Sequence, residues 1–192
     1  MRRRPNQANA SQLRVIGGEW RGRKLSFLSR QGLRPTADRV RETLFNWLSP
    51  HLAGAKCLDL FAGSGALGIE ALSRGAARCD FVDCDHEALD FVAQHLAALN
   101  AQDRATVSQG SALEHLSLAS EPWDIIFVDP PFDCGLGAPA LAQLTQQNCL
   151  HRESLVYFET RRSGAERAPE ALFELLRDKT AGDVRYQLLK PI

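Results

Sequence analysis

Residues 56–75 read KCLDLFAGSGALGIEALSRG and decide the fold. An apolar run ends at the glycine loop Gly63-Ser64-Gly65, and apolar residues at helical spacing then follow as far as Gly75, a stop signal. Glycines allow a tight turn, and backbone N–H groups at the start of a helix can face a ligand. Strand, glycine loop and helix in this order are typical of the first unit of a nucleotide-binding α/β fold.

Asp59 separates two classes of ligand for this loop. Gly63, Gly65 and Gly68 satisfy the dinucleotide pattern G-x-G-x-x-G, and Asp83 follows Gly63 by 20 residues, as a ribose-binding acid should. A carboxylate directly before the loop would repel a pyrophosphate, but it would attract a cationic amino group and a sulfonium. S-adenosylmethionine carries both cations and no phosphate. Taken alone, Asp59 can equally be a cap of the next helix.

Beyond this unit, strand-like and helix-like segments alternate, which predicts an α/β fold with a doubly wound, mostly parallel sheet. A C-terminal antiparallel hairpin closes the pattern. In such sheets ligands lie beyond the carboxyl ends of the strands, at the switch point of strand order, and three strand ends carry an acid: Asp59, Asp83 and Asp129. We expect strands at 77–82, 106–109, 123–128 and 154–159, helices at 86–99, 113–119 and 137–147, and hairpin arms at 173–176 and 184–188.

The first 50 residues differ from the rest of the chain in charge. They hold 11 Lys/Arg and 3 Asp/Glu, a formal charge of +8, whereas residues 51–192 hold 12 and 20, a charge of −8. A basic front on an acidic body favours a polyanionic partner for the front segment. We expect a disordered basic tail at 1–11, a hairpin and helix extension at 12–50 that docks this partner, and a catalytic domain at 51–192.

Within the extension we expect a hairpin with arms at 13–16 and 20–28 and with Gly17-Gly18 at the turn. Its second arm combines Trp20 with basic residues. Such a mixture can stack on an unpaired base while it binds phosphate. An exposed edge strand protected by charge explains the same residues equally well.

A helix is expected to follow as far as residue 48, with Thr36 or Asp38 as its N-cap. Its apolar residues have helical spacing and should face the core. Arg39, Arg41 and Glu42 should then face solvent or a ligand.

The sharpest signal is Asp129-Pro130-Pro131-Phe132, directly after an apolar strand. Two prolines fix the backbone and remove its N–H groups, so that carbonyl oxygens remain as acceptors. This suits a planar group with an amino function: the ring stacks, while the carboxylate and a carbonyl accept the amino hydrogens. These hydrogen bonds favour a pyramidal nitrogen whose lone pair can attack a methyl donor, and alignment provides much of the rate. A rigid turn after a buried strand is the plainer alternative.

Two longer strings resemble a known family. Residues 34–46 (RPTADRVRETLFN) and 59–75, together with the Asp-Pro-Pro-Phe motif, are similar to the RsmD family, within the amino-methyltransferase branch of the Rossmann-like S-adenosylmethionine enzymes. The likeness runs from Leu13 to Leu189. It implies a bacterial methyltransferase that uses S-adenosylmethionine and acts on a guanine N2 of 16S rRNA. It carries no role over to the arginine-rich tail.

The motifs and the resemblance together predict three sets of site residues. Asp83 is suited to accept hydrogen bonds from the ribose hydroxyls, Cys84 and Ala112 to line the adenine face, and Ser111 to lie near its edge. The predicted catalytic residues are Asp129, Pro130, Pro131 and Phe132. The predicted cofactor-binding residues are Thr36, Asp59, Phe61, Gly63, Ser64, Gly65, Asp83, Cys84, Ser111 and Ala112. The predicted RNA-binding residues are Arg14, Trp20, Arg21, Arg23, Lys24, Arg34 and Arg39.

Three rival functions stay open. A methyltransferase that acts on adenine N6 would share Asp-Pro-Pro-Phe, although such DNA enzymes usually carry a target-recognition domain, for which 192 residues leave no room. A nicotinamide oxidoreductase is disfavoured by Asp59. A non-catalytic RNA-binding module would leave the three strand-end acids unused. The small molecule that raises the melting temperature discriminates among them.

Composition limits the remaining possibilities. The chain has five cysteines and no C-x-x-C pattern, so we expect reduced thiols and no metal site. No window reaches transmembrane length, and no apolar segment follows the basic N-terminus. We therefore expect a cytoplasmic monomer whose partner is 16S rRNA or the small-subunit particle.

Overall fold

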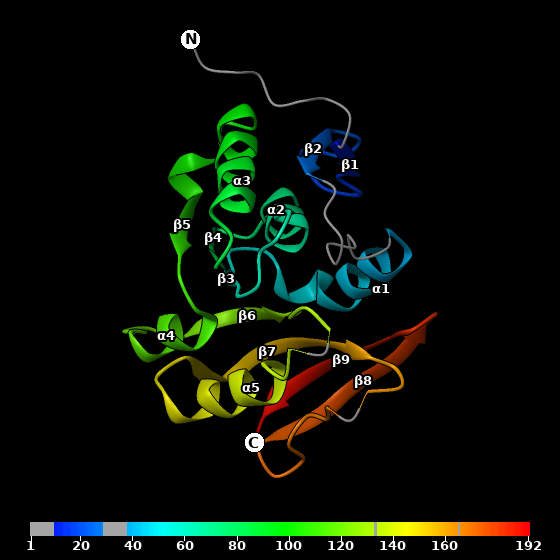
Figure 1. Ribbon diagram of the computed structural model, residues 1–192, viewed down its shortest axis with the longest axis vertical. Coiled ribbons are helices and arrows are strands. Elements are labelled where there is room, and N and C mark those ends of the chain that lie inside the picture. The colour runs from blue at the N-terminus through cyan, green and yellow to red at the C-terminus, as the bar shows by residue number, and fades with distance from the viewer. Residues whose placement is uncertain (1–9, 29–37, 133, 165) are drawn as a thin grey trace.

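The computed structural model describes residues 10–28, 38–132, 134–164 and 166–192 (Figure 1). Within these residues one seven-stranded sheet has the order β5-β4-β3-β6-β7-β9-β8. Strands β3 to β7 run parallel, and β9 is antiparallel to both β7 and β8, so the predicted fold class is confirmed. The strands are β3 (Lys56–Asp59), β4 (Arg78–Asp83), β5 (Ala105–Gln109), β6 (Trp123–Val128), β7 (Leu150–Arg161), β8 (Phe173–Ala181) and β9 (Val184–Pro191).

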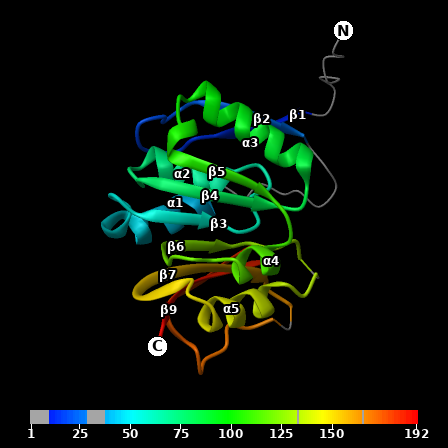
Figure 2. The same ribbon diagram turned by 90° about the vertical axis from the view of Figure 1, so that its left-hand side faces the viewer.

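Helices cover both faces of the sheet (Figure 2). One face carries the first three helices and the other face carries the last two, each with its own apolar core cluster. In the described part of the chain no helix is long and apolar enough to span a membrane. The helices are α1 (Asp38–Leu48), α2 (Ala66–Ser73), α3 (His86–Ala98), α4 (Ala112–Ser117) and α5 (Gly137–Gln146), with single turns η2 (Ser49–His51) and η3 (Gln102–Arg104).

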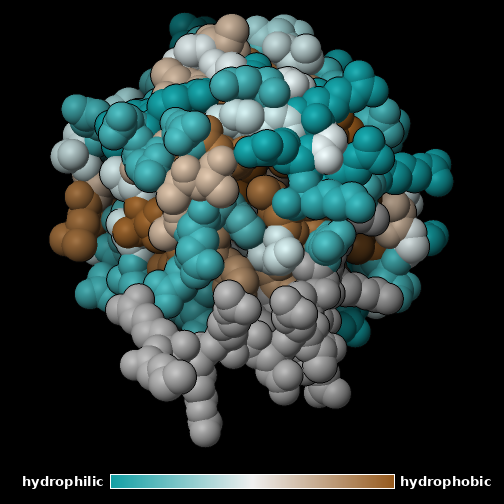
Figure 3. Space-filling model, turned by 90° about the horizontal axis from the view of Figure 1, so that it is seen from above, coloured by the Kyte–Doolittle hydropathy of each residue, from teal (hydrophilic) through white to brown (hydrophobic). Residues whose placement is uncertain are grey.

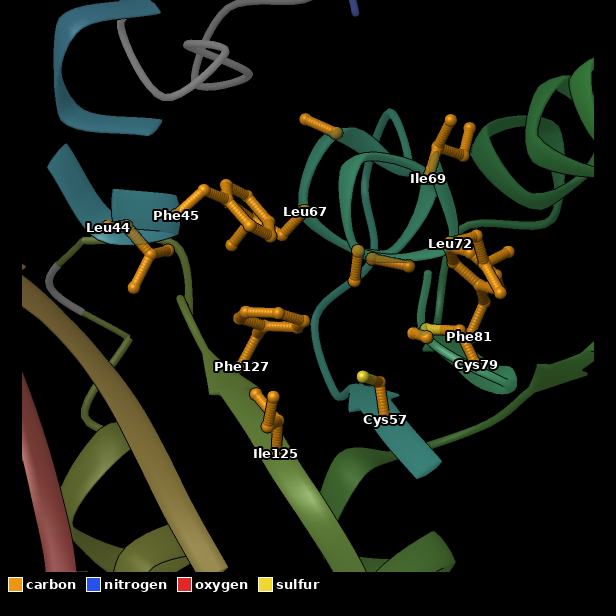
Figure 4. Close-up of a cluster of buried hydrophobic side chains, with 14 of the residues drawn as sticks. Leu44, Phe45, Cys57, Leu67, Ile69, Leu72, Cys79, Phe81, Ile125 and Phe127 are labelled. Atoms are coloured by element: carbon orange, nitrogen blue, oxygen red, sulfur yellow. The ribbon is translucent and has the colours of Figure 1, made fainter. Parts of the chain in front are cut away.

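The core under α1 and α2 fixes which way the functional side chains point. Phe45 of α1 lies beside Phe127 of β6, with ring centroids 6.0 Å apart (Figure 4). Residues two apart on a strand share one face of the sheet. Asp59 therefore lies on the face of Cys57, and Asp129 follows Phe127 on the same face, which is the one that α1 and α2 cover.

The switch point of strand order lies between β3 and β6. The chain builds β4 and β5 on one side of β3 and then returns to place β6 on the other side. Asp59 is paired in register with Phe127, and the N–H of Leu60 donates to the carbonyl oxygen of Phe127 at 3.1 Å. The carboxyl ends of these two strands therefore meet where ligands bind in doubly wound sheets.

The N-terminal hairpin exists, but its bounds differ from the prediction. β1 (Ala10–Arg14) pairs antiparallel with β2 (Lys24–Leu28), so β1 begins inside the expected tail. The connection runs over residues 15–23 rather than over Gly17-Gly18 alone. The reason is that the connection bonds to α2: the N–H groups of Glu19 and Trp20 donate to Ser73, at 2.7 Å to its carbonyl oxygen and 3.0 Å to its Oγ.

Glu70 of α2 also binds the connection between β1 and β2. Its carboxylate accepts hydrogen bonds from the N–H groups of Ile16 and Gly17, both at 2.8 Å. It also forms ion pairs with Arg74 at 2.7 Å and with Arg41 at 3.6 Å. This buried carboxylate, 1% exposed, thus joins the hairpin to the helix that follows the glycine loop.

Arg41 is the buried partner of this anchor. Its side chain is 0% exposed and also donates to the carbonyl oxygen of Arg14 at 2.9 Å. The expectation that Arg41 faces solvent or a ligand is wrong, because its guanidinium is drawn into the core between Glu70 and Asp38. Asp38 lies in the first turn of α1 rather than before it, so it is not the N-cap that the sequence offered, and it pairs with Arg41 at 2.6 Å. The alternative N-cap, Thr36, lies outside the described residues.

Candidate active site

The glycine loop has the backbone that its sequence predicts. Gly63 and Gly65 adopt positive φ angles of 50° and 74°, which side chains with a Cβ disfavour. Gly65 is the residue before α2, so the loop presents the start of that helix. A Cβ at Gly68 would lie 2.3 Å from the ring of Phe81, so only glycine lets α2 approach β4 this closely. The glycines serve both the turn and the packing behind it.

Asp59 lies at the end of β3 and is 2% exposed. Its Oδ2 accepts a hydrogen bond from the N–H of Gly68 at 2.9 Å. The pKa of Asp59 is raised to about 8, mainly by burial and to a smaller extent by the negative charges of Asp129 and Asp83, while the hydrogen bond from Gly68 acts in the opposite direction. Among the described residues no Lys or Arg forms an ion pair with it. A buried acid with this environment fits a ligand that brings its own positive charge.

Asp83 ends β4 and bonds to the glycine loop directly. Its Oδ2 accepts from the N–H of Gly63 at 2.7 Å, and its Oδ1 accepts from the N–H of Asp85 at 2.9 Å. The half-buried carboxylate is thus held in one orientation, beside the loop where a ribose would lie. Asp85 itself caps α3 through the N–H groups of Glu87 and Ala88.

The remaining predicted cofactor residues that the structure describes line the same edge of the sheet, whereas Thr36 lies outside the described residues. Cys84 follows Asp83 and is exposed, as is Ser111, which precedes α4. Ala112 is 8% exposed and belongs to the second core cluster, so its side chain provides an apolar wall. Phe61 is half-buried and Ser64 is buried in the loop.

The Asp-Pro-Pro-Phe segment leaves β6 at the switch point. Asp129 is half-buried, Pro130 is buried and Pro131 is exposed. Phe132 is half-buried, and the guanidinium carbon of Arg161 lies 5.7 Å from its ring centroid. A cation over one face of an aromatic ring is attracted by the ring's quadrupole. Arg161 therefore supports the ring that the sequence assigns to stacking.

Two residues near this segment were not predicted. Glu159 of β7 is 5% exposed, and its charge interacts with that of Asp129. Arg161 ends the same strand. The predicted strand stopped at residue 159, whereas β7 continues to Arg161 because β9 pairs with it as far as Val184. Both residues come near this segment because β7 lies next to β6 in the sheet, a contact that no local sequence pattern indicates.

Five of the seven predicted RNA-binding residues are exposed in the structure. Arg14, Arg21, Arg23, Lys24 and Arg39 are exposed, and Arg23 also donates to the carbonyl oxygen of Ala98 at 3.2 Å. The end of the molecule with the hairpin and α3 is mostly hydrophilic (Figure 3). Arg34 lies outside the described residues.

Trp20 departs from the prediction. Its side chain is 7% exposed, and the guanidinium of Arg104 lies 5.5 Å from its ring centroid. The connection of the hairpin folds onto α2, and the indole goes with it into the core cluster. Trp20 is therefore a packing residue, and the expectation that it stacks on an unpaired base is wrong for this conformation.

Solved structures of similar shape establish the class of protein. A putative methyltransferase from Escherichia coli has a TM-score of 0.84 and 43% identity, over 94% of this chain and 98% of that one. A putative methylase from Haemophilus influenzae has a TM-score of 0.81 and 38% identity, over 95% and 99%. The fold is that of a Rossmann-like methyltransferase.

Sequence comparison narrows the class to a family. The family described as conserved hypothetical protein 95 matches residues 13–190. The chain is 45% identical over 186 residues to the ribosomal RNA small subunit methyltransferase D of Escherichia coli K12, covering 97% of this chain and 93% of that protein. The protein of the same name from Haemophilus influenzae is 43% identical over 180 residues, covering 92% and 93%. The chain belongs to this family, the RsmD family.

Proposed function

We propose that this methyltransferase uses S-adenosylmethionine to methylate the exocyclic N2 of a guanine in small-subunit (16S) rRNA. The observation that carries the proposal is the Asp129-Pro-Pro-Phe segment at the switch point, on the strand next to Asp59. The segment offers acceptors and a ring to an aromatic amine. The relatives named ribosomal RNA small subunit methyltransferase D supply the class of substrate.

The two carboxyl groups at the ends of β3 and β4 fit S-adenosylmethionine. Asp59 is a buried acid that pairs with no described cation, and it lies on the face where the ligand's ammonium and sulfonium would come. Asp83, fixed by Gly63 and Asp85, holds its remaining lone pairs toward the ribose hydroxyls. S-adenosylmethionine supplies the methyl group, carried on a sulfonium that is a good leaving group.

The chain's contribution to transfer is to orient the acceptor. Asp129 and the carbonyl oxygen of Pro130 accept the two amine hydrogens, so that the nitrogen lone pair points toward the methyl group. Phe132, supported by Arg161, holds the base by stacking. Such pre-positioned acceptors act where positive charge develops on nitrogen, and alignment of the two reactants lowers the barrier further.

The extension at residues 12–50 docks the RNA in this proposal. Its exposed arginines and Lys24 lie on the hairpin and at the start of α1. A base must leave its stack to reach Phe132, so an unpaired guanine is a better substrate than one in a duplex.

The test is a methylation assay on small-subunit rRNA from a strain that lacks the gene, both naked and in assembled particles. We expect one methyl group on a guanine N2, identified by mass spectrometry of digested RNA. Label on adenine N6 would support the other reaction of the same branch instead. Label on DNA or protein, or no label on either form of RNA, would refute the proposed substrate.

A further inference from the structure

Glu159 lies beside Asp129 on the neighbouring strand. Val128 and Phe158 are partners in the parallel ladder of β6 and β7, so the residues that follow them are neighbours. Side chains alternate along a strand, which puts Asp129 on the face of Phe127 and Glu159 on the face of Tyr157. Those two rings touch edge to face, with centroids 6.4 Å apart. Both carboxyl groups therefore point to the same side of the sheet.

Acids and phenols surround Glu159, and no ion pair joins it to a described Lys or Arg, although Arg161 lies two residues further on the same strand. The Tyr157 hydroxyl donates to its Oε2 at 2.5 Å, and Tyr186 is its partner in register on β9. Asp129 faces it from β6, and Asp59 stands beyond Asp129 on β3. Burial raises the pKa of Glu159 to about 8, with the negative charge of Asp129 as a second cause. Glu159 therefore holds a proton at neutral pH.

We propose that Glu159 is a positioning residue that forms a carboxyl pair with Asp129 and sets the charge of the acceptor-amine site. Asp129 touches the amine, and Glu159 acts through Asp129. The inference rests on the proposed function, since it concerns how the same site handles the amine. It assigns a role to a strand residue outside the glycine loop and the Asp-Pro-Pro-Phe segment.

The reaction releases a proton from the amine, and the carboxyl pair determines how readily that proton leaves. The amine lone pair forms the nitrogen–carbon bond while the carbon–sulfur bond breaks and leaves its electrons on sulfur. The nitrogen then carries one positive charge and must lose one proton, which passes to Asp129 and on to water. A second negative charge nearby raises the proton affinity of Asp129 and stabilises the cationic nitrogen. Ionised Glu159 provides that charge.

The first test is the pH profile of single-turnover methyl transfer. In the wild type the rate should rise with pH through a midpoint near 8, where Glu159 loses its proton. Glu159→Gln keeps the shape of the side chain but stays neutral, so it should match the wild type at pH 6.5. At pH 9 it should be slower by about tenfold, since a neighbouring charge shifts a pKa by about one unit or more.

Tyr157→Phe provides a second variant in which Glu159 stays intact. The hydroxyl stabilises the ionised carboxylate, so its loss should move the midpoint of the profile to higher pH. The exposed carboxylate Glu174 of β8 is the matched control, and Glu174→Gln should keep the wild-type profile. If the rate of Glu159→Gln still rises with pH as in the wild type, or if it is lowered equally at every pH, the proposal is overturned.

A second readout needs neither cofactor nor RNA. The raised pKa means that folded Glu159 keeps its proton between pH 4.5 and 8, where the unfolded chain has lost it. The stability of the free protein should therefore fall as pH rises through this window, by up to tenfold in the folding equilibrium constant per pH unit for this group. Glu159→Gln should remove that part of the slope, and an unchanged slope would show that the pair does not hold the proton. This result stands even if the enzyme proves to methylate another substrate.

Discussion

Two regions of the molecule bury acids on the same face of the sheet, but only one of them pairs its acid with described cations. Under the hairpin, Glu70 meets two arginines and two backbone N–H groups, all within 3.6 Å. At the strand ends, Asp59 and Glu159 are nearly as buried, yet among the described residues each has hydrogen bonds and no paired cation. Burial raises the pKa of both to about 8.

The presence or absence of a paired cation distinguishes an acid that holds the fold together from acids suited to bind a ligand. A buried charge is tolerated when opposite charges and hydrogen bonds replace its water. Glu70 has such partners, and they fasten the hairpin to α2. Asp59 and Glu159 lack them, so a ligand that brings positive charge gains from both. The predictions below test this contrast, from the largest expected effect to the smallest.

Asp129→Ala should have the largest effect, because it removes the acceptor that faces the amine. Loss of one such pre-positioned group typically costs about 10²–10³-fold in rate. Affinity for S-adenosylmethionine should stay within a few-fold of the wild type. Single-turnover transfer and calorimetric titration measure the two quantities. A variant that transfers at the wild-type rate would refute the assignment of the amine site.

Glu70→Ala should be the most damaging change to stability. It removes the buried carboxylate beside Arg41 and leaves the exposed Asp38 as its ion-pair partner among the described residues; breaking a buried pair from one side costs about 3–5 kcal/mol. Urea unfolding measures the loss. The control is Glu121→Ala, which removes an exposed partner of Lys56 and should leave stability nearly unchanged. A Glu70→Ala loss as small as that of the control would remove the anchor role.

The sequence predicts the positions that depend on local pattern. The glycine loop, the mostly parallel sheet implied by alternation and the acids at three strand ends all follow from patterns within short segments. Asp83 then lies at the end of its strand beside the loop, as its spacing from Gly63 predicts.

The sequence does not predict contacts between distant segments. Glu70 sits in an apolar run, and its backbone partners are 53 and 54 residues away, so nothing local indicates that it is buried. Arg41 and Trp20 were assigned to the surface for the same reason. Glu159 needed the register of β6 against β7, which only the folded sheet provides.

Asp59→Asn tests the other side of the contrast, through cofactor binding. Below pH 8 the free protein holds a proton on Asp59, and a bound cation should displace it. Calorimetry at pH 7 in buffers of different ionisation enthalpy should detect the release of about one proton. Asp59→Asn should abolish the release and weaken binding by about 10- to 150-fold. Asp90→Asn, an exposed change on α3, should do neither. Binding of S-adenosylmethionine with no proton release in the wild type would contradict the environment assigned to Asp59.

The smallest effects are expected on the outer side of the hairpin. Arg21→Ala and Lys24→Ala remove exposed charges while the buried anchor at Glu70 stays intact. Each lost phosphate contact should flatten the slope of log affinity against log salt by about 0.7 for single-stranded RNA and weaken binding only moderately.

Point changes are a cleaner test than deletion of the hairpin, because Leu13, Val15 and Leu25 pack in the core. Arg177→Ala on β8, at the far edge of the sheet, is the matched control and should keep the wild-type slope. Cofactor affinity should not change in any of the three variants. Equal slopes for Arg21→Ala, Lys24→Ala and the control would show that the RNA docks elsewhere, and the hairpin would then serve only to cover α2.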